Sequence, residues 1–360
     1  MSTTDSVRPL IYFFSFVGPN YSRSSTVLNF RSSQIDKKYL HFNSGIMGII
    51  RTILYNRDEL RSASAIVVMS PCQLIVPFAK ILLRKKIILD AGWPLTDGNL
   101  SRGMHKRKPF GSLLLFLLDL ISFHVSDKIL LESQSQVIRC KKLFRLHEKK
   151  MIVQFTGLDE SQFKNLESKS KLIQRLESEI KIANKSLIVI FRGKINRESG
   201  FDLILETAGL MSDMASFIFV VGPGQDDLFL PTNVHLVSEI SNAEMQYLYQ
   251  LADVSLGQIS NHKRLNYTIP HKAFESAYFS QCYVTANSKG ISELFDENSV
   301  IYLSEISTSG LYEALTKLLD KDVRKKYCHE ISKVYKEKTS QTKINAVFDR
   351  SVRDTLAQDS

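Results

Sequence analysis

The chain has 360 residues and 44% hydrophobic residues, which is enough for about two domains, each with a core. Its four cysteines are far apart and form no C-x-x-C pair, which argues against a structural zinc site and indicates a reducing compartment. The net charge is +10, but the basic clusters are not interleaved with aromatic residues and no nucleic-acid motif is present, so we expect no binding to nucleic acid.

The N-terminal segment predicts a strand and no secretory signal. Residues 1–8 lack the apolar core of a signal peptide, and Leu10–Val17 is short enough to be a first strand. The loop after this run contains Gly18, Asn20 and Arg23, and a helical pattern follows it. In a strand–loop–helix unit these residues follow the carboxyl end of the strand, so we expect them at a ligand site.

A second candidate ligand site follows a buried strand. Ala65–Met69 and Lys86–Leu89 predict further parallel strands, and the latter leads into a loop with Asp90, Trp93 and Asp97. Trp93 can stack on a sugar face, and the two carboxylates can bind hydroxyl groups. The alternative is a turn-rich loop in which the Asp side chains bond the local backbone.

The apolar segment Phe110–Val125 predicts a helix that is too short to cross a bilayer, so we predict no transmembrane segment. The cationic stretch Met104–Pro109 directly precedes it, which is an arrangement suited to an anionic membrane surface. The alternative is a packed domain helix beside an ordinary solvated surface. Val125–Leu131 predicts the last main strand of this half, and Leu143–Lys150 predicts the helix after it.

The second half repeats the order strand, small-residue turn, helix. The apolar runs Leu187–Phe191, Phe217–Val221 and Val254–Leu256 predict three parallel strands. Ligands of open parallel sheets bind beyond the carboxyl ends of the strands. The residues directly after these runs are therefore the candidate ligand contacts.

The turn after the first of these strands suits a diphosphate. Gly193 and Gly200 allow close approach of the backbone, and a helix that starts near Gly200 offers unpaired amides to an anion. Lys194 and Arg197 add two cations beside that helix terminus. The alternative is an ordinary strand-to-helix turn with solvated charges.

Several segments of the second half match one known family in the family's order. They are Phe191–Lys194, Arg197–Asp202, Val220–Gly224, Asn233–Leu236, Ile240–Met245, Tyr247–Val254, Pro270–Glu275 and Gly290–Leu294. Together they resemble the retaining GT-B glycosyltransferases that are glycosyltransferase family 4-like, also described as glycosyl transferases group 1. The resemblance covers residues 150–305 well and the N-terminal half only in general layout. It implies an α/β protein with two Rossmann-like domains that face each other across a cleft.

The resemblance also implies roles for individual residues. Lys194 stands where the family usually has an arginine for the donor diphosphate, and Glu275 matches the glutamate that holds the ribose hydroxyls. Ser199 stands where a lysine is usual, and the nearby Arg197 is a substitute for that charge. Tyr267 stands where the family has a glutamate that contacts the donor sugar. The expected catalytic residues are Lys194, Arg197 and Glu275, and the expected nucleotide-binding residues are Arg192, Gly193, Gly222, Gly224, His235, Leu236, Ile240, Lys272 and Glu275.

Two of these residues have plain structural alternatives. Glu275 is also suited to stabilise the first turn of a helix through the helix dipole. Lys272 is either a nucleotide ligand or a solvated charge. The resemblance implies an acceptor domain over residues 1–160 and a nucleotide-sugar domain over residues 161–339, with a helix over 340–357 that packs back on the first domain. The expected acceptor-side residues, beside the interdomain cleft, are Gly18, Asn20, Arg23, Asp90, Trp93 and Asp97.

The function implied by the resemblance is retaining transfer of a sugar from a UDP- or GDP-sugar to a hydroxyl acceptor, without a metal or other cofactor. The expected acceptor is a glycan or lipid-linked intermediate of cell-surface polysaccharide synthesis, and the expected location is cytoplasmic, peripheral on the inner face of the plasma membrane. The alternatives are a nucleotide-sugar-binding protein without transferase activity and a GT-B-fold sugar epimerase.

Overall fold

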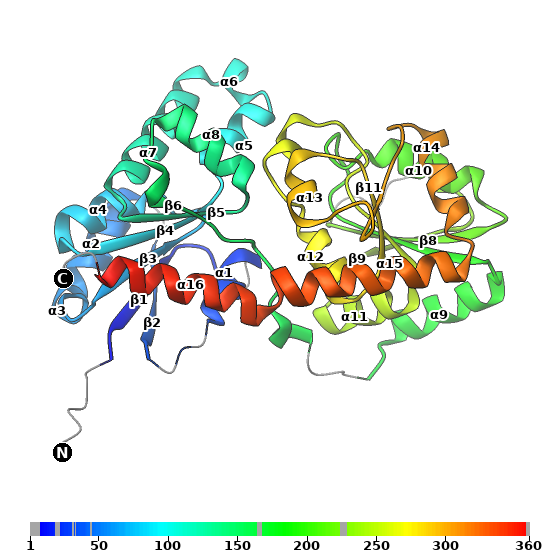
Figure 1. Cartoon of the computed structure of the whole chain (residues 1–360), viewed down its shortest axis with the longest axis horizontal. Helices are drawn as coiled ribbons and strands as arrows, with labels where there is room; N and C mark the ends of the chain where they lie inside the picture. Colours follow the sequence, from blue (N-terminus) through cyan, green and yellow to red (C-terminus); the bar gives the residue numbers. More distant parts are fainter. Residues whose placement is uncertain are drawn as a thin grey trace. The chain divides into compact units, whose positions relative to one another are not determined.

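The computed structural model describes residues 8–18, 22–30, 32, 34–43, 45–163, 168–223 and 229–357. The chain divides into two compact units, the first formed by Met1–Gly157 with Gln341–Ser360 and the second by Leu158–Ser340 (Figure 1). Each unit contains a six-stranded sheet in which all neighbouring strands are parallel. The predicted α/β class with two Rossmann-like domains is therefore confirmed.

The sheet of the first unit has the strand order β2-β1-β3-β4-β5-β6. Its central strands are apolar on both faces, as expected for a parallel sheet covered on both sides by helices. The edge strand β2 was not predicted, because its sequence is polar and mostly exposed. The strands are β1 (Leu10–Ser15), β2 (Asp36–His41), β3 (Ala65–Met69), β4 (Lys86–Gly92), β5 (Lys128–Leu131) and β6 (Met151–Val153).

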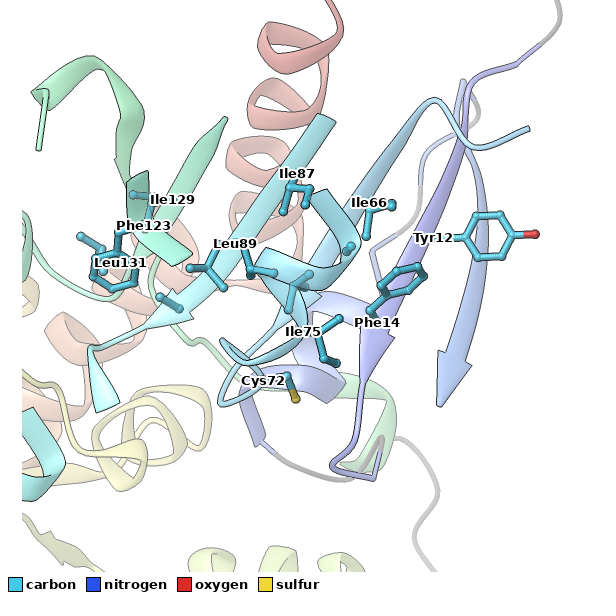
Figure 2. Packing of buried hydrophobic residues seen from close by; sticks show 14 of the residues in the cluster. Tyr12, Phe14, Ile66, Cys72, Ile75, Ile87, Leu89, Phe123, Ile129 and Leu131 are labelled. Carbon is cyan, nitrogen blue, oxygen red and sulfur yellow. The ribbon is translucent and has the colours of Figure 1, made fainter. Parts of the chain in front are cut away.

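Helices cover both faces of this sheet. One face is packed by α2 (Ile46–Tyr55), α3 (Arg57–Arg61), α4 (Ile75–Leu83), α7 (Pro109–Val125) and α8 (Gln134–Phe144). Figure 2 shows side chains of this core, with Phe14 and Leu89 contributed by strands and Ile75 and Phe123 contributed by helices. The opposite face is packed by α1 (Ser22–Leu28) and α16 (Gln341–Leu356), and the short helices α5 (Leu95–Ser101) and α6 (Met104–Arg107) follow β4.

Two predicted boundaries in the first unit are wrong. The strand expected over Val125–Leu131 begins only at Lys128, because Val125 is the last residue of α7. The helix expected over Leu143–Lys150 lies earlier, as α8, and Glu148–Lys150 is a single 3-10 turn, η1, before β6. Arg145 ends α8 in the left-handed conformation, which the polar sequence there did not reveal.

The sheet of the second unit has the order β12-β11-β10-β7-β8-β9, with the reversal of strand order at β7 and β10. Phe201 and Ile204 of α10 pack on one face, and Ile173 and Leu248 of α9 and α11 pack on the other. The strands are β7 (Leu187–Arg192), β8 (Ala215–Val221), β9 (Val234–Ser238), β10 (Val254–Leu256), β11 (Cys282–Thr285) and β12 (Ile301–Tyr302). The helices are η2 (Glu160–Phe163), α9 (Lys171–Ala183), α10 (Phe201–Leu210), α11 (Asn242–Leu251), η3 (Lys263–Asn266), α12 (His271–Tyr278), α13 (Lys289–Leu294), α14 (Thr308–Lys317), α15 (Lys321–Val334) and the π-helix η4 (Tyr335–Thr339).

The last helix, α16, is part of the first unit although it follows the second in sequence. The Phe348 ring stacks on Phe13 at a centroid distance of 5.8 Å and meets Phe30 at 4.9 Å. These rings lie in the core on the α1 side of the sheet. Throughout the described part of the chain, no helix combines the length and the apolar character needed to cross a membrane.

Candidate functional site

The candidate donor site lies at the carboxyl ends of β7 and β10, the two strands where the order of the second sheet reverses. Ligands of doubly wound sheets bind at this switch point. β7 ends at Arg192, and the loop to α10 carries Lys194 and Arg197, both exposed. The loop after β10 leads through η3 to α12, which supplies Lys272 and Glu275. Two loops and one helix terminus therefore bring cations and a carboxylate to one edge of the sheet.

The two loops are fastened to each other. The backbone amide of Ile259 donates to the Ser199 carbonyl at 2.9 Å, and the Ser260 hydroxyl donates to the Glu198 carbonyl at 2.6 Å. Arg264 forms an ion pair with Glu198 at 3.2 Å. These bonds fix the position of the β7–α10 loop, so the exposed side chains of Lys194 and Arg197 project from an ordered backbone.

Gly200 allows the two loops to approach each other closely. Its φ of +69° favours glycine, and a Cβ there would collide with the Ile259 carbonyl. We expected Gly200 to expose backbone to a ligand, but the space beside its α-carbon is taken by Ile259. At Gly193, by contrast, a Cβ would lie 3.2 Å from the Lys272 ammonium, so the absent side chain leaves room for that cation.

Glu275 is the centre of a buried polar network in the second unit. Its side chain is 2% exposed, and both carboxylate oxygens have partners within the protein. Arg192 and His271 contact Oε1, the latter at 3.0 Å through Nδ1, and the Tyr249 hydroxyl donates to Oε2 at 3.0 Å. The Arg192 side chain is 36% exposed, so the network holds a cation toward solvent with its counter-charge beneath.

Burial sets the protonation of the groups around Glu275. Burial, reinforced by Arg192, lowers the pKa of His271 to about 3, so the ring is neutral and Nδ1–H donates to the carboxylate. Burial raises the pKa of Tyr249 to about 12, so its hydroxyl stays a donor. Arg192 is therefore the cationic partner of this carboxylate, and the two neutral groups orient it.

Lys272 is a buried cation directly behind the loop. It is 6% exposed, its ammonium lies 3.9 Å from the Phe191 ring centroid, and it donates to the Gly257 carbonyl at 3.3 Å. Burial, and secondarily Arg192, lowers its pKa to about 7. An anion bound at Gly193 would lie close to this ammonium and would favour its charged form.

The remaining predicted donor residues are spread along the sheet. Gly222 follows β8 and faces open space, and Gly224 lies outside the described residues. Ile240 follows β9 and is half-buried at the carboxyl edge. The structure does not bring His235 and Leu236 to that edge, because both lie within β9.

His235 has a partner elsewhere. Its Nδ1 lies 3.3 Å from the Glu179 carboxylate on α9, and its backbone is in register with Ile218 in the middle of β8. The alternation of the strand directs this ring to the α9 side, away from the strand terminus. At the edge itself stands Glu239, which is exposed and has a φ of +53°.

In the first unit, Arg23 and Asp90 form an internal ion pair. They are 1% and 0% exposed, with the Arg23 Nη2 and Asp90 Oδ1 atoms 2.6 Å apart. Arg23 also donates to the Gln154 carbonyl at 3.0 Å and to the Thr156 hydroxyl at 3.1 Å. Of the other two residues predicted with Arg23, Gly18 is exposed and Asn20 lies outside the described residues.

Trp93 and Asp97 follow Asp90 but have different surroundings. Trp93 is partly exposed in the loop between β4 and α5. Asp97 is 6% exposed and pairs with Arg139 of α8 at 2.7 Å, while Gln136 donates to its other oxygen at 2.8 Å. Trp93 is therefore the more accessible of the two side chains.

The sequence reasoning did not identify Tyr249 and His271 as site residues. A signal existed for His271, since a histidine and a glutamate four residues apart on a helix lie on the same face. No sequence signal marked Tyr249, which comes from α11 and meets Glu275 only through the packing of α11 against the sheet. Among the described residues, no three His, Cys, Asp or Glu side chains are grouped so that they could hold a metal ion.

The architecture places the chain among GT-B glycosyltransferase folds, so the fold implied by the sequence resemblance is confirmed. The chain matches no protein-family model and no curated protein sequence. It is similar to the structure of HepE from Anabaena in complex with UDP-glucose, with a TM-score of 0.73 and 11% identity over 96% of this chain and 99% of HepE.

Two further solved structures have the same fold. A glycosyltransferase from Rickettsia africae matches with a TM-score of 0.67 and 10% identity over 98% of this chain and 100% of the other. The α,α-trehalose 6-phosphate synthase of Burkholderia multivorans matches with a TM-score of 0.65 and 11% identity over 98% and 100%. At these identities the similarity shows the fold alone, and the chemistry has to be argued from the residues of the site.

Proposed function

We propose that the chain is a glycosyltransferase that moves a sugar from a UDP- or GDP-sugar to a hydroxyl acceptor, with retention of the anomeric configuration. The observation that carries this proposal is the cationic edge of the second sheet, where Lys194 and Arg197 are exposed on a held loop and Lys272 lies directly behind it. The nucleotide sugar bound in the HepE structure supports the same class of donor.

The chemistry of such a site is charge stabilisation. The bond between the anomeric carbon and the diphosphate breaks, the acceptor oxygen forms a bond to the same face of that carbon, and the acceptor proton passes to the leaving phosphate. Negative charge accumulates on the diphosphate, where Lys194 and Arg197 stabilise it. Glu275 acts in this scheme by holding Arg192 at the edge, and its role toward a ribose is part of the proposal. No metal or other cofactor is required by this scheme.

For the acceptor we propose a glycan or lipid-linked intermediate of surface polysaccharide synthesis, met at the cytoplasmic face of the plasma membrane. Trp93 is the first-unit side chain best suited to contact it, since it is partly exposed and flat. Arg23, Asp90 and Asp97 are bonded to protein groups, so they support this edge from within.

A second candidate is a protein that binds nucleotide sugars without transferring them. Ser199, in the place of a usual lysine, is 1% exposed and donates to the Asn196 carbonyl at 2.7 Å, so it supplies no charge. Tyr267, in the place of a usual glutamate, follows η3 and supplies no carboxylate. The first departure removes a cation beside the diphosphate, where Arg197 is the proposed substitute, and the second removes the carboxylate at the sugar end.

The experiment that tests the proposal has two stages. First, a thermal-shift series with UDP- and GDP-sugars should reveal a ligand that raises the unfolding temperature, since binding at about 100 times Kd adds about 2.7 kcal/mol of stability. Second, that ligand is incubated with lipid-linked and free glycan acceptors, and products are identified by mass spectrometry. Stabilisation without transfer or hydrolysis favours the second candidate, and no stabilisation by any nucleotide sugar contradicts both.

A further inference from the structure

The helix α7 in the first unit presents an apolar face to solvent, in addition to the apolar residues that it packs into the core. Five large side chains on it are exposed, namely Phe110 by 73%, Leu113 by 53%, Leu114 by 51%, Leu117 by 40% and Ile121 by 48%. Their spacings of three, four, seven and eleven residues place them on one side of the helix. They form a continuous stripe, which we call the α7 stripe.

The inward side of α7 is held by polar as well as apolar contacts. Asp119 is 0% exposed and accepts hydrogen bonds from the Thr96 amide at 2.8 Å and the Thr96 hydroxyl at 2.6 Å. Ser122 is also buried and donates to the Gln73 carbonyl at 2.9 Å. These bonds fix the rotation of the helix, so the outward direction of the stripe is built into the fold.

Exposed cations lie at the N-terminal end of the stripe. They belong to the segment that contains α6 and the start of α7 and are Arg102, Lys106, Arg107 and Lys108. Pro109 follows as the first residue of α7, and Phe110 begins the stripe. Cationic and apolar side chains are therefore adjacent along the chain and in the fold.

A second cationic group lies at the C-terminal end of α7. A surface cavity of about 510 Å³ there is lined by Lys80, His124, Lys128, His147, Lys149 and Lys150, together with Val125, Ser126 and Asp127. The single carboxylate in this lining, Asp127, is paired with Lys80 at 2.8 Å. Lys150 donates to the His124 carbonyl at 2.6 Å, which places its ammonium against the end of the helix. The α7 stripe is therefore flanked by positive charge at both ends.

We propose that the α7 stripe docks on an anionic lipid bilayer, with α7 lying in the plane of the interface. A helix of 17 residues is about 25 Å long, so it suits a position along the surface and not across the bilayer. The apolar side chains enter the acyl boundary while the flanking cations meet lipid phosphates. The proposal concerns a surface, and it stands independently of the proposed transfer reaction.

A second copy of the chain is the other occupant that an apolar stripe suggests. Two copies that paired stripe to stripe would bring their flanking lysines and arginines together, whichever way the helices ran. Like charges at both ends oppose that arrangement, and the net charge of +10 adds to the repulsion. An anionic bilayer satisfies the same cations, so the charge pattern favours lipid.

The test is co-sedimentation of the full chain with two kinds of vesicles, one of phosphatidylcholine alone and one with about one third phosphatidylglycerol. We expect binding to the anionic vesicles that weakens with salt. Leu114→Glu with Leu117→Glu should reduce the bound fraction at least tenfold, and Lys106→Glu with Arg107→Glu should do the same. Leu114→Phe with Leu117→Phe should retain binding.

Matched controls come from the second unit. Ile182→Glu with Leu210→Glu changes two exposed apolar residues, and Lys325→Glu with Lys333→Glu changes two exposed cations. Both should bind vesicles like the original chain if the stripe is the docking site. Unfolding temperatures and nucleotide-sugar stabilisation are measured for every variant, so loss of folding or of the donor site is distinguished from loss of docking.

Four results would overturn the proposal. They are no binding to anionic vesicles, equal binding to neutral ones, full binding by the folded Leu114→Glu, Leu117→Glu variant, and equal loss in the second-unit controls. If the original chain elutes as a dimer in size-exclusion chromatography and the Leu114→Glu, Leu117→Glu variant elutes as a monomer, the stripe serves self-association instead.

Discussion

The carboxyl edges of the two sheets carry similar residues but use them differently. In the second unit, Lys194 and Arg197 project from the loop after β7 into solvent. In the first unit, Arg23 and Asp90 are sealed in an ion pair with 1% and 0% exposure. Both pairs of residues were predicted as ligand contacts by one argument, namely position after a buried strand.

The difference lies in what covers each edge. Gln154 and Thr156 accept hydrogen bonds from Arg23, and Gly92 packs against its side chain, so the cation is enclosed by its own unit. No hydrogen bond or ion pair of that kind is found for Lys194 within the described residues. A charge that the fold encloses must be paired, because burying it alone costs several kcal/mol, whereas an exposed charge stays available to a ligand. We therefore expect the first pair to contribute to stability and the second pair to act in binding, as proposed.

The largest effect should follow from breaking the enclosed pair. Asp90→Ala leaves Arg23 charged and buried, so we expect a loss of about 3–5 kcal/mol in the free energy of unfolding. Thermal and urea unfolding of the full chain measure it. Arg23→Met combined with Asp90→Leu removes both charges and should recover most of the loss. A near-zero effect of Asp90→Ala alone would show that this pair is accessible to water and would remove the contrast between the two edges.

The exposed pair should show the opposite behaviour. Lys194→Ala with Arg197→Ala should weaken binding of the nucleotide sugar at least about 100-fold, because each lost charge-assisted hydrogen bond to a phosphate costs about 1.5–3 kcal/mol. The unfolding temperature should not change. Arg175→Ala with Lys181→Ala, on the exposed side of α9, is the matched control. Unaltered donor affinity, measured by calorimetry, would exclude the diphosphate role.

Lys272 lies between the two extremes, as a buried cation at the ligand edge. Its pKa is lowered to about 7 from 10.5, so above pH 7 the unfolded chain binds a proton that the folded chain does not. Stability relative to Lys272→Met should therefore rise with pH above 7, by up to about 1.4 kcal/mol per pH unit, and should be constant below it. Urea unfolding from about pH 6 to pH 9 measures this. If the free energies of unfolding of the original chain and of Lys272→Met change in parallel with pH, the prediction is contradicted. Leu210→Met, at an exposed position, is the control substitution.

The smallest effect should come from Trp93. Trp93→Ala should lower acceptor-dependent turnover threefold to tenfold, since an aromatic contact contributes about 0.5–1.5 kcal/mol. Donor affinity should stay the same, because Trp93 belongs to the other unit. Kinetic measurements at saturating donor and varied acceptor concentration distinguish an effect on the acceptor from an effect on donor affinity. An effect on donor affinity alone would place Trp93 outside the acceptor site and would leave the first edge without a tested ligand contact.

Local sequence was sufficient for three strands of the second unit, β7, β8 and β10. The runs that begin at Leu187 and Val254 were predicted from their apolar character, because a parallel strand that is buried on both faces contains few polar residues. β2 gave no such signal, since it is an edge strand with exposed lysines. The GT-B architecture followed from turn motifs in order, and it is the part of the prediction that the solved structures confirm.

Tertiary structure alone decided which charged residues meet. The sequence determined that Arg192, Lys272 and Glu275 follow buried strands or begin a helix, since these positions depend on patterns a few residues long. It did not determine that Tyr249 contacts Glu275, that Arg23 is enclosed by Thr156, or that α7 turns its leucines outward. Exposure and ion pairing depend on residues far apart in the chain, and only the packed fold brings those residues together.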